Sequence, residues 1–326
     1  MTATVSRPGW LGALARWTPS PLAMRRAALA ALIANVGIAL SGAVVRLTSS
    51  GLGCPNWPRC TGASLVPMHN PDHPAVNMAI EFGNRMLGVA VFLTVATCLV
   101  IAIRMRPRRR SVVALAAALP LGVLLQGIIG GLTVWYALMP GWVTAHFLGT
   151  TVMIVLTVWL YERASEGDEP PRLTVRPELR TVALALVAAA ALVLIAGTVV
   201  TGTGPHAGDA SATRYPFRLD QVAHVHATLV WVTVGLTVAL IVGLRVSDAG
   251  VVARRRAAQV LGVEIVQGVI GYVQYFTGVP APLVALHVLG ACLLWVAVLR
   301  MLFATRERGA LETTPVAQPA AHLVAR

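Results

Sequence analysis

Eight apolar stretches follow one another along the chain, and each is long enough to form a membrane-spanning helix. About 20 helical residues cross the roughly 30 Å hydrocarbon core of a bilayer. Inside lipid such a segment has to be helical, because every backbone polar group needs a partner within the segment. The pattern therefore predicts an all-α membrane protein with eight transmembrane helices, at residues 27–48, 77–103, 111–135, 141–161, 180–203, 221–245, 256–278 and 283–304.

The composition agrees with this class and excludes two others. The 326 residues are 56% hydrophobic and only 12% charged, against roughly 25% charged residues in a typical soluble domain. An ordinary cytosolic enzyme and a disordered protein are therefore excluded. The formal net charge is +13, but all 26 basic residues are arginines, and most lie in short connections between the apolar stretches. We interpret this charge as a mark of membrane orientation and expect no nucleic-acid partner.

Arginines are concentrated in alternate connections, which predicts the orientation of the chain. They are dense in residues 1–26, in the connections after the second, fourth and sixth stretches, and in residues 305–326. The positive-inside rule then places both termini in the cytoplasm, and we expect a multi-pass protein of a bacterial plasma membrane. Residues 1–26 lack the apolar core of a cleavable signal, so we expect the first helix to be retained.

The connection between the first two stretches contains two cysteines, Cys54 and Cys60, within the sequence GLGCPNWPRC of residues 51–60. By the predicted orientation this connection faces the oxidising side of the membrane, where a disulfide persists. A ring closed over two prolines would be short and stiff. We expect a structural disulfide here; a redox-active pair and two free thiols are the alternatives. Cys98 and Cys292 lie inside apolar stretches, where cysteine is usually a small packing residue.

The chain contains an internal repeat. Residues 126–130 (QGIIG) recur as 267–271 (QGVIG), and residues 146–149 (HFLG) recur as 287–290 (HVLG), both at an offset of 141 (267 − 126 and 287 − 146). Each half contains four stretches, an even number, so the two halves share one orientation. This predicts two tandem, pseudo-symmetric four-helix bundles, related by an axis along the membrane normal. We expect the bundles at residues 27–161 and 180–304, with a cytoplasmic linker at residues 162–179.

Three histidines, His146, His226 and His287, lie four or five residues inside their stretches from the outer face. At 1.5 Å per residue this is a depth of roughly 6–8 Å, where an ionisable residue marks a candidate functional site. A single histidine in such a place is usually a packing residue, but repetition at one depth favours ligation. His226 and His287 would face each other across one bundle as the two imidazole ligands of a haem iron. His224 competes with His226, and we favour His226 because it matches Asn84 in the first half at an offset of 142 (226 − 84).

The corresponding position in the first half, opposite His146, is Asn84. An amide binds haem iron poorly, so the first half offers one strong ligand and one open or weakly occupied position. Glu81 and Arg85 are four residues apart on one helix face. They are either a structural ion pair, or an acid beside a substrate and a cation on a haem propionate.

These residues resemble the heme A synthase family over nearly all eight stretches. The resemblance is carried by the two histidine segments and by residues 42–48 (GAVVRLT), 50–60 (SGLGCPNWPRC), 81–85 (EFGNR) and 203–209 (TGPHAGD). It implies that a peripheral methyl group of haem O is hydroxylated successively to a geminal diol, which loses water to give the formyl group of haem A for terminal oxidases. It also implies a haem b in the C-terminal half, held by His226 and His287. Many family members have a histidine where Asn84 stands and a second cysteine pair in the third outer loop; this chain has neither.

The family's substrate, haem O, is expected in the N-terminal half, with His146 as a ligand and Glu81 as an essential acid. Arg46 and Arg85 are expected to hold propionates, and His206 to cover a haem edge. The expected partners are the farnesyltransferase that makes haem O, an electron donor or acceptor that the sequence does not identify, and the lipid bilayer. The sequence leaves open whether the chain forms a homo-oligomer.

Two other functions compete with this one. A quinol-linked, di-haem b electron-transfer protein explains the layer of histidines equally well, but it does not explain the contrast between Asn84 and His146 or the Glu81 segment. A transporter built from repeats usually has helices broken by glycine or proline at the midplane. The polar residues here gather near one face instead.

Overall fold

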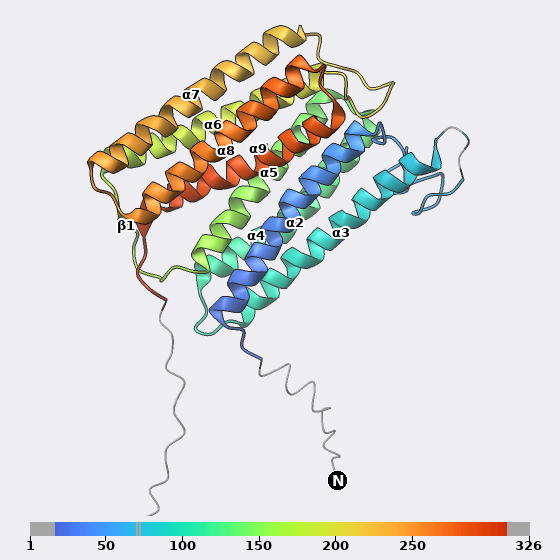
Figure 1. Ribbon diagram of the computed structural model, residues 1–326. Coiled ribbons are helices and arrows are strands. Elements are labelled where there is room, and N and C mark those ends of the chain that lie inside the picture. The colour runs from blue at the N-terminus through green and yellow to red at the C-terminus, as the bar shows by residue number, and fades with distance from the viewer. Residues whose placement is uncertain (1–16, 70, 72, 312–326) are drawn as a thin grey trace, which may run out of the picture.

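Eight long helices make up most of the part of the chain that the structure, a computed structural model, describes: residues 17–69, 71 and 73–311 (Figure 1). Much of the expected cytoplasmic N-terminal segment and most of the C-terminal tail lie outside these residues. The helices are α2 (Pro21–Leu47), α3 (Ala75–Arg104), α4 (Arg110–Trp135), α5 (Pro140–Arg163), α6 (Pro177–Thr203), α7 (Leu219–Val246), α8 (Val251–Phe276) and α9 (Ala281–Phe303).

Each predicted apolar stretch coincides with most of one helix, and every helix begins before its stretch. α2, for example, begins at Pro21 rather than at residue 27. Ser20 caps it, because its side chain accepts a hydrogen bond from the backbone N–H of Ala23 at 3.2 Å. Proline in the first turn has no N–H that needs an intrahelical partner. Helix boundaries therefore follow capping chemistry, whereas apolar composition marks only the segment suited to lipid.

Seven of the described helices, α2–α7 and α9, are long and apolar enough to cross a membrane. The chain is thus a multi-pass membrane protein. α8 has 26 residues, but it carries three consecutive arginines at 254–256 near its start and Glu264 in its middle. Length and composition therefore support seven of the eight expected spans.

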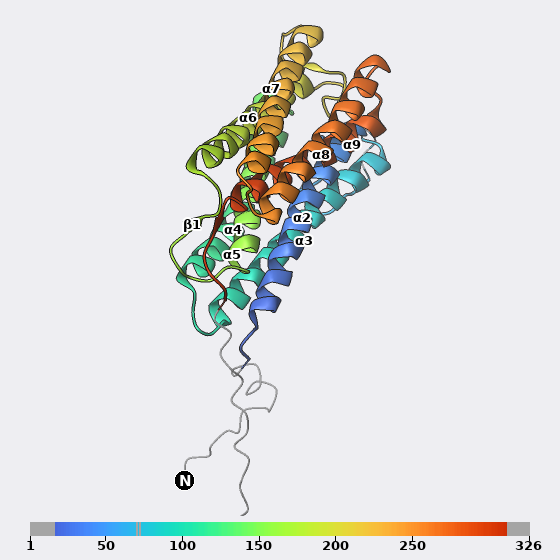
Figure 2. The ribbon, with the colours of Figure 1, turned by 60° about the vertical axis from the view of Figure 1, so that its left-hand side comes forward.

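The helices form two neighbouring groups, α2–α5 and α6–α9 (Figures 1 and 2). In each group every helix packs against the next one along the chain, and the first packs against the fourth. Between the groups, α9 packs on α2 and α5, and α5 packs on α6. The indole N–H of Trp295 in α9 donates to the carbonyl oxygen of Thr151 in α5 at 3.1 Å. Helices α5 and α9 therefore join the two groups.

The tightly packed apolar residues lie toward the end of the bundle where α2 begins. One core cluster joins Met24 of α2 to Val95 and Cys98 of α3. The other joins Leu186 of α6 to Cys292 of α9. Cys98 and Cys292 are buried free thiols, as expected of packing residues. The opposite ends of the same helices surround a cavity.

The linker between α5 and α6 is tied to the segment after α9. Strand β1 (Arg172–Leu173) pairs antiparallel with β2 (Arg306–Glu307), a pairing that the expectation of an all-α chain did not include. Next to it, the Arg109 guanidinium donates to both oxygens of Asp168, at 2.9 and 3.0 Å. These hydrogen bonds hold the pKa of the Asp168 carboxyl below its usual range. The two halves are thus also held together by their loops at this end.

Candidate functional site

A cavity of about 1900 Å³ lies at the end of the bundle opposite to β1 and β2, and all eight described helices contribute to its lining. The lining is mostly apolar, with a few polar groups. They include the four residues on which the sequence analysis placed a ligand position: Asn84, His146, His226 and His287. His206, Arg46, Glu81 and Arg85 also line it. The fold therefore brings the expected site residues of both halves to one continuous space.

His226 of α7 and His287 of α9 face each other in the second group of helices. Their ring centroids are 6.3 Å apart, and the ring planes make an angle of 70°. A metal ion held midway between them at the usual ~2 Å metal–nitrogen distance would lie about 3 Å from each centroid, because the centroid lies beyond the bonding nitrogen. The spacing would therefore allow both imidazoles to bind one ion. In the described part of the chain no group of three or more His, Cys, Asp or Glu could hold a metal ion.

Neighbouring backbone fixes the orientation of these two rings. His226 Nδ1 donates to the carbonyl oxygen of Val193 in α6 at 3.1 Å, which leaves Nε2 as the acceptor nitrogen. Nδ1 of His287 is buried without a hydrogen-bond partner. A Cβ atom placed on Gly197 would lie 3.3 Å from Cε1 of His226, and one on Gly271 would lie 3.3 Å from Cε1 of His287. Each imidazole therefore lies directly against a glycine of the helix beside it.

His224, the competitor of His226, is exposed, and its Nδ1 donates to the carbonyl oxygen of Asp220 in its own helix at 2.8 Å. Side chains two positions apart in a helix are separated by about 200° around its axis. His224 and His226 therefore point in different directions from α7, although both border the cavity.

The first group of helices places His146 of α5 in a similar setting. A Cβ on Gly130 would lie 3.2 Å from Cε1 of His146, and Nδ1 of His146 is buried without a hydrogen-bond partner. Gln126 Nε2 donates to the His146 carbonyl oxygen and to Thr150 Oγ1, both at 3.0 Å. The repeated sequence QGxIG thus supplies an amide that packs behind the histidine and a glycine that lies against its ring.

Asn84 of α3 occupies the cavity wall of the first group, and its Oδ1 accepts a hydrogen bond from Ser41 Oγ of α2 at 2.7 Å. Ser41 was not among the residues that the sequence singled out. This bond engages the amide oxygen, the atom of Asn84 that is better suited to bind a metal ion. The first group therefore presents His146 as its one imidazole facing the cavity.

Glu81 and Arg85 of α3 anchor the connection that contains the disulfide. Cys54 and Cys60 form this disulfide, as expected. Glu81 is 5% exposed; its Oε2 accepts from the backbone N–H of Cys54 and its Oε1 from Arg85 Nη2, both at 2.6 Å. Arg85 also donates to the carbonyl oxygens of Cys54, Asn56 and Arg59. The pair thus binds the loop to α3 while Glu81 still borders the cavity.

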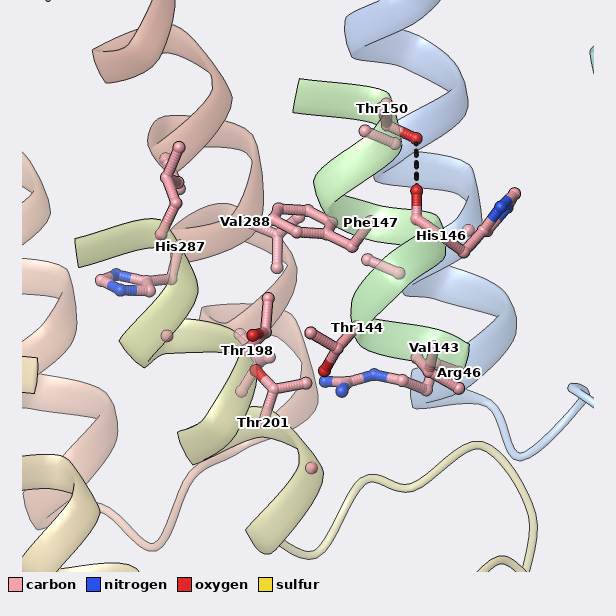
Figure 3. A pocket seen from close by; sticks show the side chains of 18 of the residues that line it. Arg46, Val143, Thr144, His146, Phe147, Thr150, Thr198, Thr201, His287 and Val288 are labelled. Atoms are coloured by element: carbon pink, nitrogen blue, oxygen red, sulfur yellow. Dashed lines mark hydrogen bonds between the residues drawn. The ribbon is translucent and has the colours of Figure 1, made fainter. Parts of the chain in front are cut away.

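Arg46 lies at the boundary between the two groups (Figure 3). Its side chain extends from α2 toward Thr144 of α5 and Thr201 of α6. Among the described residues the guanidinium of Arg46 has no hydrogen-bond or ion-pair partner, although Arg46 lines the cavity. Arg46 therefore places a guanidinium with all its donors available near the end of α2.

His206 lies in the connection between α6 and α7 and also lines the cavity. Its Nε2 donates to the Val279 carbonyl oxygen at 2.8 Å.

The residue after each histidine points toward the other group. Figure 3 shows His146 and His287 directed away from each other, with Phe147 and Val288 between them. Successive side chains in a helix are 100° apart around its axis. When a histidine faces the interior of its own helix group, the next side chain therefore points to the boundary between the two groups.

Glu264 of α8 is a buried carboxyl on the cavity wall. Its Oε1 accepts from Thr237 Oγ1 of α7 at 2.9 Å, and its Oε2 is buried without a hydrogen-bond partner. Thr237 gave no signal in the sequence, because a threonine in an apolar helix usually bonds to its own backbone.

Comparisons with known proteins find a matching family model and several similar proteins. A model of the COX15-CtaA family, described as cytochrome oxidase assembly protein, matches residues 25–299. A heme A synthase of Shewanella oneidensis is 29% identical over 183 residues, which cover 52% of this chain and 53% of that protein. A heme A synthase of Alkalihalophilus pseudofirmus is 25% identical over 158 residues, which cover 46% of this chain and 52% of that protein. A protoheme IX farnesyltransferase of Thermus thermophilus is 40% identical over 78 residues, which cover 24% of this chain and 12% of that protein. The chain spans about half the length of the curated heme A synthases it matches.

Proposed function

The chain belongs to the COX15-CtaA family of cytochrome oxidase assembly proteins, and from this premise we propose that it is a membrane oxidoreductase that converts haem O into haem A. The reaction oxidises a peripheral methyl group of the substrate to a formyl group, through successive hydroxylation and loss of water from a geminal diol. The observation that carries the proposal is the pair His226 and His287, whose ring centroids are 6.3 Å apart on the wall of a cavity of about 1900 Å³. The same cavity extends to a second imidazole site at His146.

In this proposal the two helix groups are tandem, pseudo-symmetric four-helix bundles with separate roles. Residues 27–161 bind the substrate, residues 180–304 hold a resident haem b, and residues 162–179 link them. α8 counts as the eighth span, because it packs between α7 and α9 and its arginines lie near its start. Both termini then lie in the cytoplasm, with the cavity near the outer face of the membrane. Support comes from the equivalent contacts of Gly130 with His146 and of Gly271 with His287.

The resident haem b would be held by the Nε2 atoms of His226 and His287. When bound, it supplies one-electron transfer. The chain's own contribution is to orient the two imidazoles, through the Val193 carbonyl and the two glycines, and to exclude water with the apolar wall. These residues fit the group, because each histidine has a nitrogen free for a metal and no competing protein ligand beside it.

The substrate site would use His146 as a single strong ligand for the iron of haem O. Asn84, whose Oδ1 accepts from Ser41, leaves the opposite side of the substrate weakly ligated or open. Glu81 is the candidate acid at the substrate edge, because it is the carboxylate of α3 that borders the cavity. The backbone N–H of Cys54 and the guanidinium of Arg85 donate hydrogen bonds to the Glu81 carboxylate, so the disulfide loop helps to fix its orientation.

Arg46 is the strongest candidate for holding a propionate. A guanidinium that lines an apolar cavity without a counter-ion among the described residues is costly, and a carboxylate of a bound haem would supply one through charge-assisted hydrogen bonds. Arg85 remains a second candidate, although the loop carbonyls and Glu81 already accept hydrogen bonds from its two Nη atoms. His206, fixed by the Val279 carbonyl, would cover a haem edge.

The proposed partners are the farnesyltransferase that produces haem O and an electron donor or acceptor outside the chain. The similarity of part of the chain to a protoheme IX farnesyltransferase agrees with a place in the same pathway. The alternative function, electron transfer between two b haems, is not favoured by the family or by the single imidazole beside Asn84.

A substitution at Gly197 tests the haem b site without removing a ligand. Alanine there would bring a Cβ to 3.3 Å from His226 Cε1, so the ring must move, and we expect roughly tenfold weaker retention of haem b. The control is Gly42→Ala, where a Cβ would meet nothing within 4 Å. Gly42 is the matching position of the first half, because residues 42–45 (GAVV) resemble 197–200 (GTVV) at an offset of 155 (197 − 42). The measurement is the ratio of haem to protein after gel filtration. Equal ratios in the two variants would contradict the assigned site.

The function as a whole is tested by extracting the haems from protein purified from cells that make haem O, and identifying them by mass. We expect haem b together with haem O or haem A. A protein that holds only haem b, and that leaves added haem O unchanged under turnover conditions, would be an electron carrier instead.

A further inference from the structure

A second, smaller cavity of about 300 Å³ lies far from the haem site, between α4 and α5 at the end of the bundle that carries β1 and β2. It is lined by Ser111, Ala114, Leu115, Ala118, Trp159, Arg163 and Arg308. Four of these residues form one face of α4, because their spacing of three or four residues is that of neighbours along a helix. The cavity is therefore a groove that follows two helices.

The groove has a polar end and an apolar end. Ser111 lies in the first turn of α4 and Ala118 two turns further on, roughly 10 Å along the axis at 1.5 Å per residue. At the polar end are the guanidinium groups of Arg163 and Arg308; toward the apolar end are Ala118 and Trp159. Ala114 and Trp159 are exposed, so the groove opens toward lipid.

Positive charge at the polar end exceeds the negative charge that faces it. Glu166 is shared by Arg163, Arg306 and Arg308, at 3.2, 3.6 and 3.9 Å. Asp168 is shared by Arg109 and Arg163, at 2.9 and 2.7 Å. Four guanidinium groups thus share two carboxylates.

Three nitrogens of this cluster are buried without a hydrogen-bond partner: Arg109 Nη1, Arg306 Nη1 and Arg308 Nε. Buried donors of charged groups are costly to leave without an acceptor. Arg308 itself lines the groove. Among the described residues these three donors have no acceptor, and one of them belongs to an arginine that borders the groove.

We propose that this groove binds one anionic phospholipid of the leaflet at this end of the bundle. Its phosphate contacts Arg308, Arg163 and Ser111, and an acyl chain lies along Ala114, Ala118 and Trp159. Only an amphiphile matches both ends of the groove, and anionic headgroups are attracted to basic sites between helices. Because Arg163 belongs to α5 and Arg308 follows α9, the lipid joins the two halves at the membrane surface. This inference does not depend on the proposed enzymatic function.

Native mass spectrometry of the full chain, released from nanodiscs of phosphatidylglycerol or of phosphatidylcholine, tests the site. We expect one phosphatidylglycerol to be retained by the wild type. Arg308→Gln should retain roughly tenfold less. Ala114→Phe, which fills the channel without changing the charge, should lower retention similarly. Arg108→Gln is the matched control: this exposed arginine lies at the same end outside the groove, and its loss should leave retention unchanged.

The outcomes separate the sources of the anion. If inorganic phosphate displaces the lipid signal and protects the protein against thermal unfolding equally well, the site takes a free anion and the lipid assignment fails. If Ala114→Phe and Arg308→Gln both retain phosphatidylglycerol like the control, the groove is not a lipid site. Should Arg308→Gln fail to fold, Ala114→Phe alone decides, because it leaves the arginine cluster intact.

Discussion

The His287→Ala variant is expected to purify without the spectrum of a stable b-type haem. The ring centroids of His226 and His287 are 6.3 Å apart. Among the described residues that line the cavity, this is the one pair of imidazoles that face each other. Removing one ring leaves a single axial ligand and an apolar void in its place. The reduced-minus-oxidised spectrum of protein purified with haem supplied in excess measures the loss, which should be complete rather than graded.

Two histidines provide controls for this variant. His224→Ala removes an exposed imidazole of the same helix that bonds to its own backbone, so it should keep the full spectrum. His146→Ala should also keep the b-type spectrum but lose bound haem O, because His146 faces the other half of the cavity. A normal spectrum in His287→Ala would refute the ligand assignment, and with it the role of the C-terminal half.

The elements that could be predicted from the sequence depend on local composition or on exact repetition. Apolar stretches located all eight helices, because lipid allows no other structure for them. The offset of 141 residues that matched His146 with His287 also matches Gly130 with Gly271, and both glycines lie against the matched rings. The preference for His226 over His224 rests on its match to Asn84 at an offset of 142 (226 − 84), because helix geometry says only that the two side chains point in different directions.

Contacts between distant segments could not be predicted in the same way. The hydrogen bond from Cys54 N–H to Glu81 depends on how the loop returns to α3, and apolar patterning carries no information about it. The same is true of the bond between Ser41 and Asn84. The strands β1 and β2, only two residues each, are set by the meeting of the linker with the segment after α9. α8 was predicted as an ordinary span although its arginines weaken that assignment.

The continuity of the cavity changes how the site is understood. The sequence indicated two separate cofactor sites in two bundles, whereas residues of all eight described helices line one cavity. Phe147 and Val288 lie between His146 and His287 at the boundary, and Arg46 reaches across the same boundary beside Thr144 (Figure 3). An electron carrier and a substrate bound on the two sides would therefore be separated by side chains alone, with one cation close to both.

The Glu81→Gln variant is expected to keep haem b but to lose roughly 10²- to 10⁴-fold in the rate of haem A formation, the usual contribution of a general acid or base. Glutamine retains an oxygen that can accept the Cys54 N–H bond, so the loop should stay attached while the ionisable group is lost. Rates of haem A formation, measured by mass at saturating haem O, test this.

The competing interpretation is that Glu81 only anchors the disulfide loop, and Asn77→Ala distinguishes the two. Asn77 Nδ2 donates to the carbonyl oxygen of Ser49 at 2.9 Å, so it anchors the same loop to the same helix from outside the cavity. If anchoring were the whole role of Glu81, both variants would lose activity to a similar, small extent and would be equally susceptible to proteolysis in residues 51–60. A large loss confined to Glu81→Gln, with an intact loop, identifies the carboxyl group itself as the group that the reaction requires.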